Sequence, residues 1–406
     1  MATKRSATSG SGKLKTILGQ PSWRVASKRV EAFVTRTGGQ IAPVVFDRRG
    51  RKIAPFSVAP WASEKLDRTT PPIIRALRGD FFCMPFGGNA TPWRGEKHPI
   101  HGETANQPWT FQSLEQTDGR AELRLNLRTR IRPGIVEKLI ALPDDHDAVY
   151  QRHIVRRMSG PMCFGHHAML RFPDEPGSGV ISTSRFTYAQ VFPRPVENPE
   201  KRGYSMLQPG AEFSRLDRVP TITGQTTDLS HFPARRGFED IVMLVADERL
   251  PFAWTAVTFP AQRFAWFALK DPRVLRSTIF WLSNGGRHYP PWNGRHVNVM
   301  GLEDVTSYFH TGLAESAGEN PLSRRGVRTH MPLDPRQPLA VNYIMGIVQL
   351  PKGFERVESI EADRRAARGG IVLSDSKRGV RTPVDLTFLF AGAVDASTTN
   401  ERPRGT

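Results

Sequence analysis

The sequence predicts a large all-β protein with few short helices, and three observations carry this prediction. Short runs of β-branched and aromatic residues recur along the chain of 406 residues. Glycine (35 residues) and proline (33 residues) separate these runs with turn-forming chemistry. Helical periodicity is nearly absent, apart from two short stretches near 71–77 and 305–313. These features together favour a large antiparallel β-sandwich or a barrel-like β architecture.

The expected strands begin near the N-terminal end. Residues 23–47 contain two β-like runs joined at a Thr-Gly-Gly turn signal, 37–39. The clearest alternation lies at 121–131, where leucines alternate with arginines as in a half-buried antiparallel strand. Further strands are expected at 148–156, 164–172, 240–246, 253–259, 264–269, 277–282, 296–302, 339–350, 370–373 and 384–390. Residues 193–230 contain few β-formers and are expected to form a long excursion or lid over one end of the sheets.

We expect one β-sandwich domain over residues 21–393, with disordered tails at 1–20 and 394–406. The first tail is basic and rich in serine and glycine, but it lacks the apolar stretch of a secretory signal. No apolar run approaches the roughly 18 residues that a membrane span requires. Cys83 and Cys163 are too few for a disulfide framework. We therefore expect a cytoplasmic protein without a membrane partner.

The formal net charge of +18 raises the question of an anionic partner. Lysine and arginine are scattered through the chain, with short concentrations only at 47–52, 152–157 and 364–365. No nucleic-acid motif accompanies them, so we interpret the charge as a solvated surface and expect no nucleic-acid partner. A basic β-protein that binds anionic polymers is the competing hypothesis, and it predicts steep salt dependence of binding.

Residues 78–111 combine glycines, aromatic rings and hydrogen-bonding side chains more densely than an ordinary loop. A sugar needs this mixture, because its C–H faces lie on aromatic rings while its hydroxyls require a few fixed polar partners. The alternative interpretation is a packed loop with a satisfied histidine.

Two later segments carry groups that exchange protons. His166 and His167 are neighbours on an expected strand, so at most one of them faces a given cleft. Glu303 ends an apolar run after Gly301, and a carboxylate leaving an apolar wall is suited to act as a base. The structural alternatives are a buried histidine pair and an acid that caps the helix expected at 305–313. No cluster has zinc spacing, and no phosphate loop or nucleophile elbow is present.

The three segments together resemble the galactose mutarotase-like superfamily, which includes aldose 1-epimerases and hexose-6-phosphate epimerases. The matching motifs are Pro85-Phe86-Gly87, His101-Gly102, Trp109, His167-Ala168-Met169-Leu170 and Gly301-Leu302-Glu303. Their order is that of the superfamily, and the similarity extends over residues 23–350. The chain departs from the superfamily pattern at Ala168, Leu170 and Asp304, where the superfamily has proline, an aromatic residue and proline.

The resemblance implies a β-sandwich whose concave face binds carbohydrate, and an activity that interconverts the anomers of a sugar by acid–base ring opening. It implies Glu303 as the base and His167 as the imidazolium acid, with His166 in this role if the strand register differs. His101 would hold the sugar and polarise its hydroxyls.

Four further residues are expected to bind the substrate by the same resemblance. Arg78 and Asp80 are the candidate partners of sugar hydroxyls, and Trp109 and Trp292 are the candidate stacking surfaces. No metal or organic cofactor is expected, and the partner would be a small carbohydrate, with phosphorylated and acidic sugars included. A non-catalytic carbohydrate-binding protein on the same fold is the alternative function.

Overall fold

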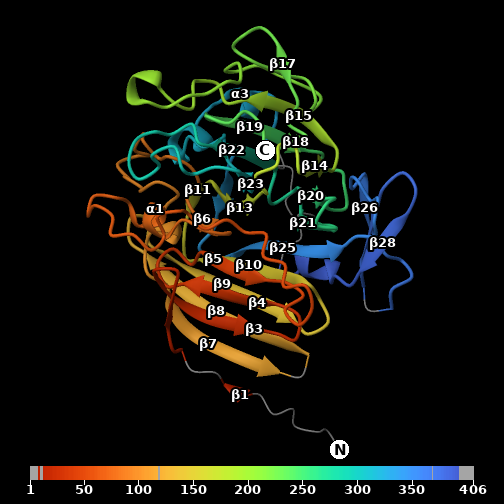
Figure 1. The fold of residues 1–406 in the computed structure, drawn as a ribbon. Helices are drawn as coiled ribbons and strands as arrows, with labels where there is room; N and C mark the ends of the chain where they lie inside the picture. The colour runs from red at the N-terminus through yellow and green to blue at the C-terminus, as the bar shows by residue number, and fades with distance from the viewer. Residues whose placement is uncertain (1–7, 10–11, 118, 368, 393–406) are drawn as a thin grey trace, which may run out of the picture.

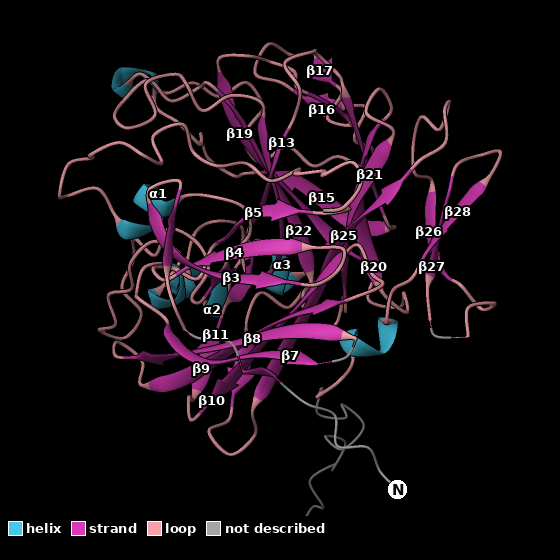
Figure 2. Ribbon diagram, turned by 60° about the horizontal axis from the view of Figure 1, so that its bottom comes forward, coloured by secondary structure: helices cyan, strands magenta, loops and turns pink. Residues whose placement is uncertain are grey.

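The computed structural model of the protein describes residues 8–9, 12–117, 119–367 and 369–392. Two large antiparallel sheets pack against each other, which confirms the predicted β-sandwich (Figure 1; Figure 2). The first sheet has ten strands in the order β1 (Thr8–Ser9), β7 (Thr110–Thr117), β8 (Arg120–Thr129), β9 (Gly134–Pro143), β10 (Ala148–Arg156), β25 (Leu339–Gln349), β21 (Phe264–Lys270), β20 (Ala253–Phe259), β14 (Gly179–Thr183) and β18 (His231–Phe232).

The second large sheet has seven strands. Its order is β15 (Phe186–Val191), β19 (Phe238–Ala246), β22 (Ser277–Asn284), β23 (Val299–Thr306), β12 (Phe164–His166) and β6 (Phe82–Cys83), while β13 (Ala168–Arg171) also pairs with β23. Smaller sheets are formed by β2 (Lys15–Ile17), β3 (Gln20–Ala26), β4 (Glu31–Thr35) and β5 (Ile41–Val45), by β11 (Gly160–Met162) and β24 (Met331–Leu333), by β16 (Val219–Pro220) and β17 (Thr226–Thr227), and by β26 (Ser359–Ala362), β27 (Ile371–Ser374) and β28 (Gly379–Thr382).

Helices are few and short in the described part of the chain. They are α1 (Pro72–Ala76), α2 (Leu313–Ala317) and α3 (Pro321–Arg324), with 3₁₀ turns η1 (Glu103–Ala105), η2 (Pro199–Lys201) and η3 (Leu386–Leu389). The helix expected at 71–77 is confirmed by α1. None of the described helices is long and apolar enough to cross a membrane.

Strand β8 shows why this sequence forms sheets. Its leucines Leu123, Leu125 and Leu127 are buried in the core, while Arg124 and Arg128 on the other face are exposed. The strand pairs in antiparallel register with β7 and β9, as the alternation predicts. The periodicity of the sequence therefore sets both the strand and the face that it buries.

A buried ion pair joins the two large sheets across the core. The Nζ atom of Lys270 on β21 lies 2.5 Å from Oδ1 of Asp304 on β23, and both side chains are 2% exposed. Thr278 on β22 donates a hydrogen bond to the same carboxylate at 2.7 Å. Asp304 thus points toward the ten-stranded sheet, and its neighbour Glu303 points to the opposite face of β23.

Several expectations about element ends are wrong. Strand β23 continues to Thr306, because Val305 pairs with Ser277 of β22, so no helix starts at residue 305 and Glu303 lies inside a strand. Residues 386–389 form η3 rather than a strand. Residues 15–20 form β2 and the start of β3, so the expected N-terminal tail is not disordered there. Residues 1–7, 10–11 and 394–406 of the expected tails lie outside the described residues.

The outer surfaces of the sandwich are partly covered. Residues 193–230 form the expected long excursion over one end of the sheets, with only η2, β16 and β17 in it (Figure 1). The sheet β26–β28 and η3 pack on the outer face of β10, β20, β21 and β25 and form a second apolar cluster there. Cys83 and Cys163 are both buried free thiols.

Candidate functional site

A buried carboxylate and two imidazoles meet at the face of β23 that points away from the ten-stranded sheet. The Oε1 atom of Glu303 lies 3.2 Å from Nε2 of His167, and its Oε2 atom forms a short hydrogen bond with Nε2 of His310. Glu303 is fully buried. Both oxygens of this carboxylate therefore face imidazole rings rather than bulk water.

His167 lies in the break between β12 and β13, and its neighbour His166 points the other way. His167 stacks on Phe81 with ring centroids 4.6 Å apart. His166 faces the interior of the sandwich, where its Nδ1 lies 2.9 Å from Oδ2 of Asp80 and its ring stacks on Tyr343. Of the two histidines, only His167 reaches Glu303.

His101 faces the same centre from the loop between β6 and η1. Its ring centroid lies 5.0 Å from that of His167 and 5.4 Å from that of His310. The backbone N–H of Gly87 donates to Nδ1 of His101 at 3.3 Å. The neutral ring consequently carries its proton on Nε2, where it can be donated to a ligand.

Burial favours the neutral form of His101 and of His167. Burial lowers the pKa of His101 well below its usual value, and the neighbouring His167 and His310 lower it further. Burial also lowers the pKa of His167, although the Glu303 carboxylate opposes this shift. Burial thus favours the neutral ring of His167, whereas the carboxylate favours the imidazolium that the sequence leads us to expect.

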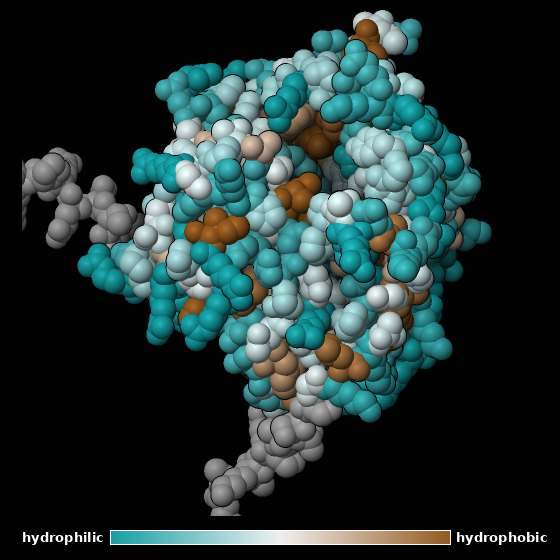
Figure 3. All heavy atoms as spheres, turned by 90° about the vertical axis from the view of Figure 1, so that its left-hand side faces the viewer, coloured by the Kyte–Doolittle hydropathy of each residue, from teal (hydrophilic) through white to brown (hydrophobic). Residues whose placement is uncertain are grey.

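The histidines open onto a cavity of about 80 Å³. Its other lining residues are mainly apolar: Ile73, Ile74, Leu77, Phe81, Ile100, Ile241, Trp281, Arg287 and Trp292. Ordinary ligand sites measure roughly 300–1,000 Å³, so a sugar-sized ligand requires movement of the cover. Ile73 and Ile74 on α1 and the exposed Ile100 form that cover. Figure 3 shows the side of the molecule on which α1 lies, with hydrophobic groups scattered among hydrophilic ones.

Arg287 forms one wall of the cavity together with two tryptophans. Its guanidinium lies over the rings of Trp281 and Trp292, at 5.3 and 4.5 Å from their centroids. The Nε atom of Arg287 lies 2.6 Å from Glu197 and 3.9 Å from Glu239. Burial raises the pKa of Glu239 to about 7, while Arg287 opposes this rise. The carboxyl groups of Glu197 and Glu239 therefore lie beside the positive charge of Arg287. Arg287 lines the cavity, but its charge is not free to bind an anion.

Asn89 couples the loop that carries His101 to the segment that carries His310. Its Nδ2 donates to the carbonyls of Pro85, Gly87 and Pro99, and its Oδ1 accepts from the N–H of Leu313. The N–H of Gly88 also donates to the carbonyl of His310 at 2.7 Å. A Cβ on Gly87 would lie 2.7 Å from the His310 backbone, so glycine allows this close approach. The two segments form one packed unit.

The sequence and the structure were each compared with known proteins, and only the comparison of structures gives matches. No protein-family model matches the sequence, and no curated protein matches it. A galactose mutarotase-like protein from Clostridium acetobutylicum superimposes with a TM-score of 0.59 at 12% identity, covering 86% of this chain and 100% of its own. The protein has the galactose mutarotase-like fold.

Two further structures share this mutarotase-like fold. A candidate aldose 1-epimerase from Escherichia coli K12 has a TM-score of 0.54 at 14% identity, covering 82% of this chain and 100% of its own. A galactose mutarotase related enzyme from Lactobacillus acidophilus has a TM-score of 0.52 at 10% identity, covering 82% of this chain and 99% of its own.

On this mutarotase-like fold, four residues expected at the site lie elsewhere. His166 is inside the sandwich, as described above. Asp80 is fully buried and accepts from Gln151 at 2.6 Å as well as pairing with His166. Trp109 is buried and donates to the carbonyl of Thr104. These three side chains are bonded to protein groups inside the fold, so the expectation that they act at the site is wrong.

Arg78 is the fourth of these residues. Its guanidinium is fully buried and donates to the backbone carbonyls of Ile17, Leu18 and Ala76. Burial lowers its pKa to about 10. Arg78 therefore stabilises the attachment of β2 and does not line the cavity.

Sequence reasoning missed His310, Trp281 and Arg287. His310 lies within 305–313, where the sequence predicts a helix, but β23 ends at Thr306 and the chain then brings His310 back to Glu303. A histidine seven residues after Glu303 was the available signal. His167, Glu303 and His310 also place one ligand atom each within 4.8 Å of one another, a spacing that a metal ion could bridge. In the structure these atoms pair with one another.

Proposed function

We propose that the protein is an aldose 1-epimerase-like isomerase that interconverts the anomers of a sugar or sugar derivative. The pairing of Glu303 with His167, which together with His101 lines a cavity, is the observation that supports this proposal. Anomer exchange needs a base and an acid placed together, and it needs no redox group.

The proposed reaction begins when Glu303 accepts the proton of the anomeric hydroxyl. The imidazolium form of His167 protonates the ring oxygen and becomes neutral, the bond between C1 and the ring oxygen breaks, and an open-chain aldehyde results. Rotation about the C1–C2 bond and reversal of the two proton transfers give the other anomer. His101 would hold the sugar by donating from Nε2. The steps conserve every proton and require no cofactor.

Substrate entry is part of the proposal because a cavity of about 80 Å³ is too small for a sugar. The cover formed by Ile73, Ile74 and Ile100 would open to admit the substrate and close behind it. Closure excludes water and strengthens the interactions of Glu303 with the reacting hydroxyl. The substrate is a small carbohydrate, and phosphorylated or acidic sugars belong to the range to be screened.

The experiment follows anomer exchange by NMR with a panel of hexoses, hexose phosphates and uronic acids. Glu303→Gln should lower the catalysed rate by about 10²–10⁴-fold, the usual contribution of a general base. Glu137→Gln on the outer face of β9 is the matched control and should retain full activity. Sugar binding without any acceleration by the wild-type protein would favour the alternative, a non-catalytic carbohydrate-binding protein. Absence of both binding and acceleration would reject both functions.

A further inference from the structure

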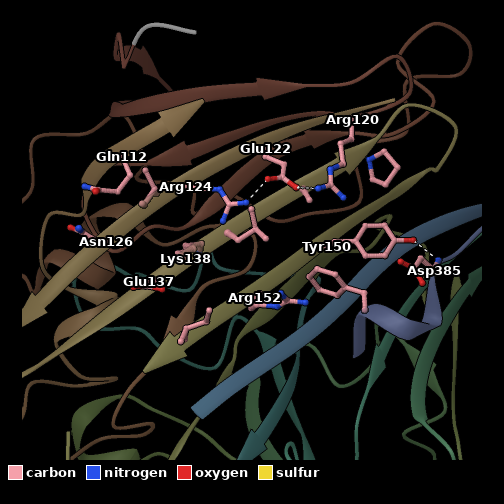
Figure 4. Close-up of a pocket in the computed structure, with 16 residues that line it drawn as sticks. Gln112, Arg120, Glu122, Arg124, Asn126, Glu137, Lys138, Tyr150, Arg152 and Asp385 are labelled. Atoms are coloured by element: carbon pink, nitrogen blue, oxygen red, sulfur yellow. Dashed lines mark hydrogen bonds and ion pairs between the residues drawn. The ribbon is translucent and has the colours of Figure 1, made fainter. Parts of the chain in front are cut away.

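A second cavity, of about 450 Å³, lies on the outer face of the ten-stranded sheet (Figure 4). Strands β8, β9 and β10 form its floor, and η3 closes one side through Phe388. Its volume falls within the roughly 300–1,000 Å³ of small-molecule sites. It is several times larger than the cavity of the proposed isomerase centre.

The strand register brings two arginines to this groove from strands that are not neighbours. Leu139 on β9 pairs with Arg124 on β8 and with Arg152 on β10. The three residues form one row across the sheet, so the two arginine backbones lie about 10 Å apart, two strand spacings. Both guanidiniums can therefore reach a single ligand above Leu139. Arg152 belongs to the basic concentration at 152–157 that the proposed isomerase function does not use.

Arg152 is held in place but keeps donors free. Its Nε donates to Oδ1 of Asn342 at 2.8 Å, and its guanidinium lies 4.7 Å from the centroid of Phe388. Asn342 is fixed in turn by donating to the carbonyls of Leu389 and Ala391. Within the described part of the chain, the two Nη groups of Arg152 donate to no protein atom, and no carboxylate pairs with it. The two Nη groups are thus held in one orientation with their N–H donors available, an arrangement that suits a carboxylate or phosphate.

The acidic groups around the groove do not balance its cations. Glu122 is shared by Arg120 and Arg124, at 2.7 and 2.6 Å. Glu137 pairs with Arg156 at 2.9 Å. The carboxylate of Asp385 accepts from the N–H and hydroxyl of Thr387.

The charge left over falls on Arg152. Burial and the charge of Arg124 lower the pKa of Arg152, although Glu122 opposes this, which shows that the two arginines lie close enough to repel each other. An anion between them would relieve that repulsion. The apolar side chains of Leu139, Ala141 and Phe388 would contact the rest of such a molecule.

We propose that this groove, lined by Arg124, Arg152 and Phe388, binds an organic oxyanion: a small molecule with a carboxylate or phosphate group on a body that covers the apolar floor. The carboxylate or phosphate lies between the two guanidiniums, and the body of the molecule lies along Leu139 and Ala141. This site is separate from the proposed isomerase centre and does not depend on it.

The test measures binding of glucose 6-phosphate, glucuronate, glucose and inorganic phosphate to the full-length protein by calorimetry in 50 mM salt. At least one of the two organic anions should bind, and the stronger one identifies the preferred oxyanion. Arg152→Gln should weaken that binding about ten- to a hundredfold, as expected for loss of a charge-assisted fork. Arg128→Gln is the matched control, because Arg128 lies on the same face of β8 but outside the groove.

Three results would overturn the proposal. The first is that neither organic anion binds. The second is that Arg152→Gln and Arg128→Gln weaken binding equally, and the third is that inorganic phosphate binds as tightly as the organic anions. The second result would indicate a diffuse charge effect, and the third a site for a bare ion. Glu303→Gln should leave this binding unchanged, so failure here is distinguishable from failure of the proposed isomerase. Circular dichroism of each variant checks that the sheet is intact.

Discussion

The Oε1 atom of Glu303 lies 3.2 Å from Nε2 of His167, although the two residues lie far apart in the sequence. The second oxygen of the carboxylate is held by His310. The hydrogen bond at this oxygen limits the orientations of the carboxylate and leaves Oε1 without a hydrogen-bond partner among the described residues.

His310 positions Glu303, and its removal should affect the rate more than binding. His310→Ala leaves Oε2 without its donor, and kcat should fall about ten- to a hundredfold, the cost of one lost charge-assisted hydrogen bond. His310→Gln retains a donor and should recover part of this loss. The anomer-exchange assay, analysed for kcat and KM separately, checks the prediction. A change confined to KM would show instead that His310 only contacts the substrate.

Gly301 leaves room for the carboxylate on β23. A Cβ added at this residue would lie 2.6 Å from Oε1 of Glu303 and 3.1 Å from Cβ of Trp281. Gly301→Ala should therefore displace Glu303, abolish most activity and destabilise the protein by about 1–3 kcal/mol. Gly88→Ala is the control, because its Cβ would approach the His310 carbonyl only to 3.4 Å. Urea unfolding and anomer exchange of both variants give the comparison, and equal behaviour of the two would contradict the prediction.

The buried ion pair between Lys270 and Asp304 should be costly to break from one side. Lys270→Met leaves the Asp304 carboxylate buried without its cation, and we expect a loss of about 3–5 kcal/mol of stability. The double variant Lys270→Met with Asp304→Leu removes both charges and should recover most of this loss. Urea midpoints of the single and double variants measure the effect. If the double variant is less stable than Lys270→Met, the pair stabilises the fold beyond charge compensation.

Stability should fall in mild acid because several histidines are buried in the neutral form. Burial lowers the pKa of His296 to about 3, and the pKa values of His101 and His153 lie well below normal for the same reason. Unfolded histidines titrate near 6.5, so below this pH the unfolded chain binds more protons than the folded one. The stabilisation is complete above pH 6.5 and decreases by about 1.4 kcal/mol per pH unit for each such histidine down to its folded pKa.

Urea unfolding at pH 7.5, 6.0 and 5.0 measures this slope. His153→Phe should reduce the slope, since one proton fewer is taken up on unfolding. It should not lower stability at pH 7.5, because neither ring nitrogen of His153 has a hydrogen-bond partner among the described residues and the ring packs against the rings of Phe82, Trp109 and His166. A flat stability between pH 7.5 and 5.0 would refute the assignment of neutral buried imidazoles.

The sequence was sufficient to predict what depends on local alternation. Strand β8 and the sandwich follow from leucines that recur at every second position and from the many turn signals. The opposite orientation of His166 and His167 follows from the same rule. The end of β23 was not predictable in this way, because Glu303 and Asp304 interrupt its apolar pattern and each is satisfied by a partner from a distant strand or loop.

The site was predictable only in part for a related reason. The residue types and order of Glu303, His167, His101 and Trp292 carry a chemical signal, and the structure brings these four residues together around the cavity. Arg78 and Asp80 carry the same signal, but their partners are backbone carbonyls and buried side chains that only the fold brings near. Conversely, Arg287 reaches the cavity wall through Glu197 and Glu239, a set of contacts that no sequence spacing reveals.

The hydrogen bonds of Asn89 tie together access and chemistry. Asn89 links the loop that carries His101 to the segment that carries His310. If that loop moved far enough to admit a sugar, it would therefore also pull His310 away from the carboxylate of Glu303. The open form would then bind substrate and release product but would lack an oriented base. The closed form could carry out the reaction but could not release its product. If the chain catalyses the proposed reaction, its maximal rate would be set by how fast this loop opens and closes.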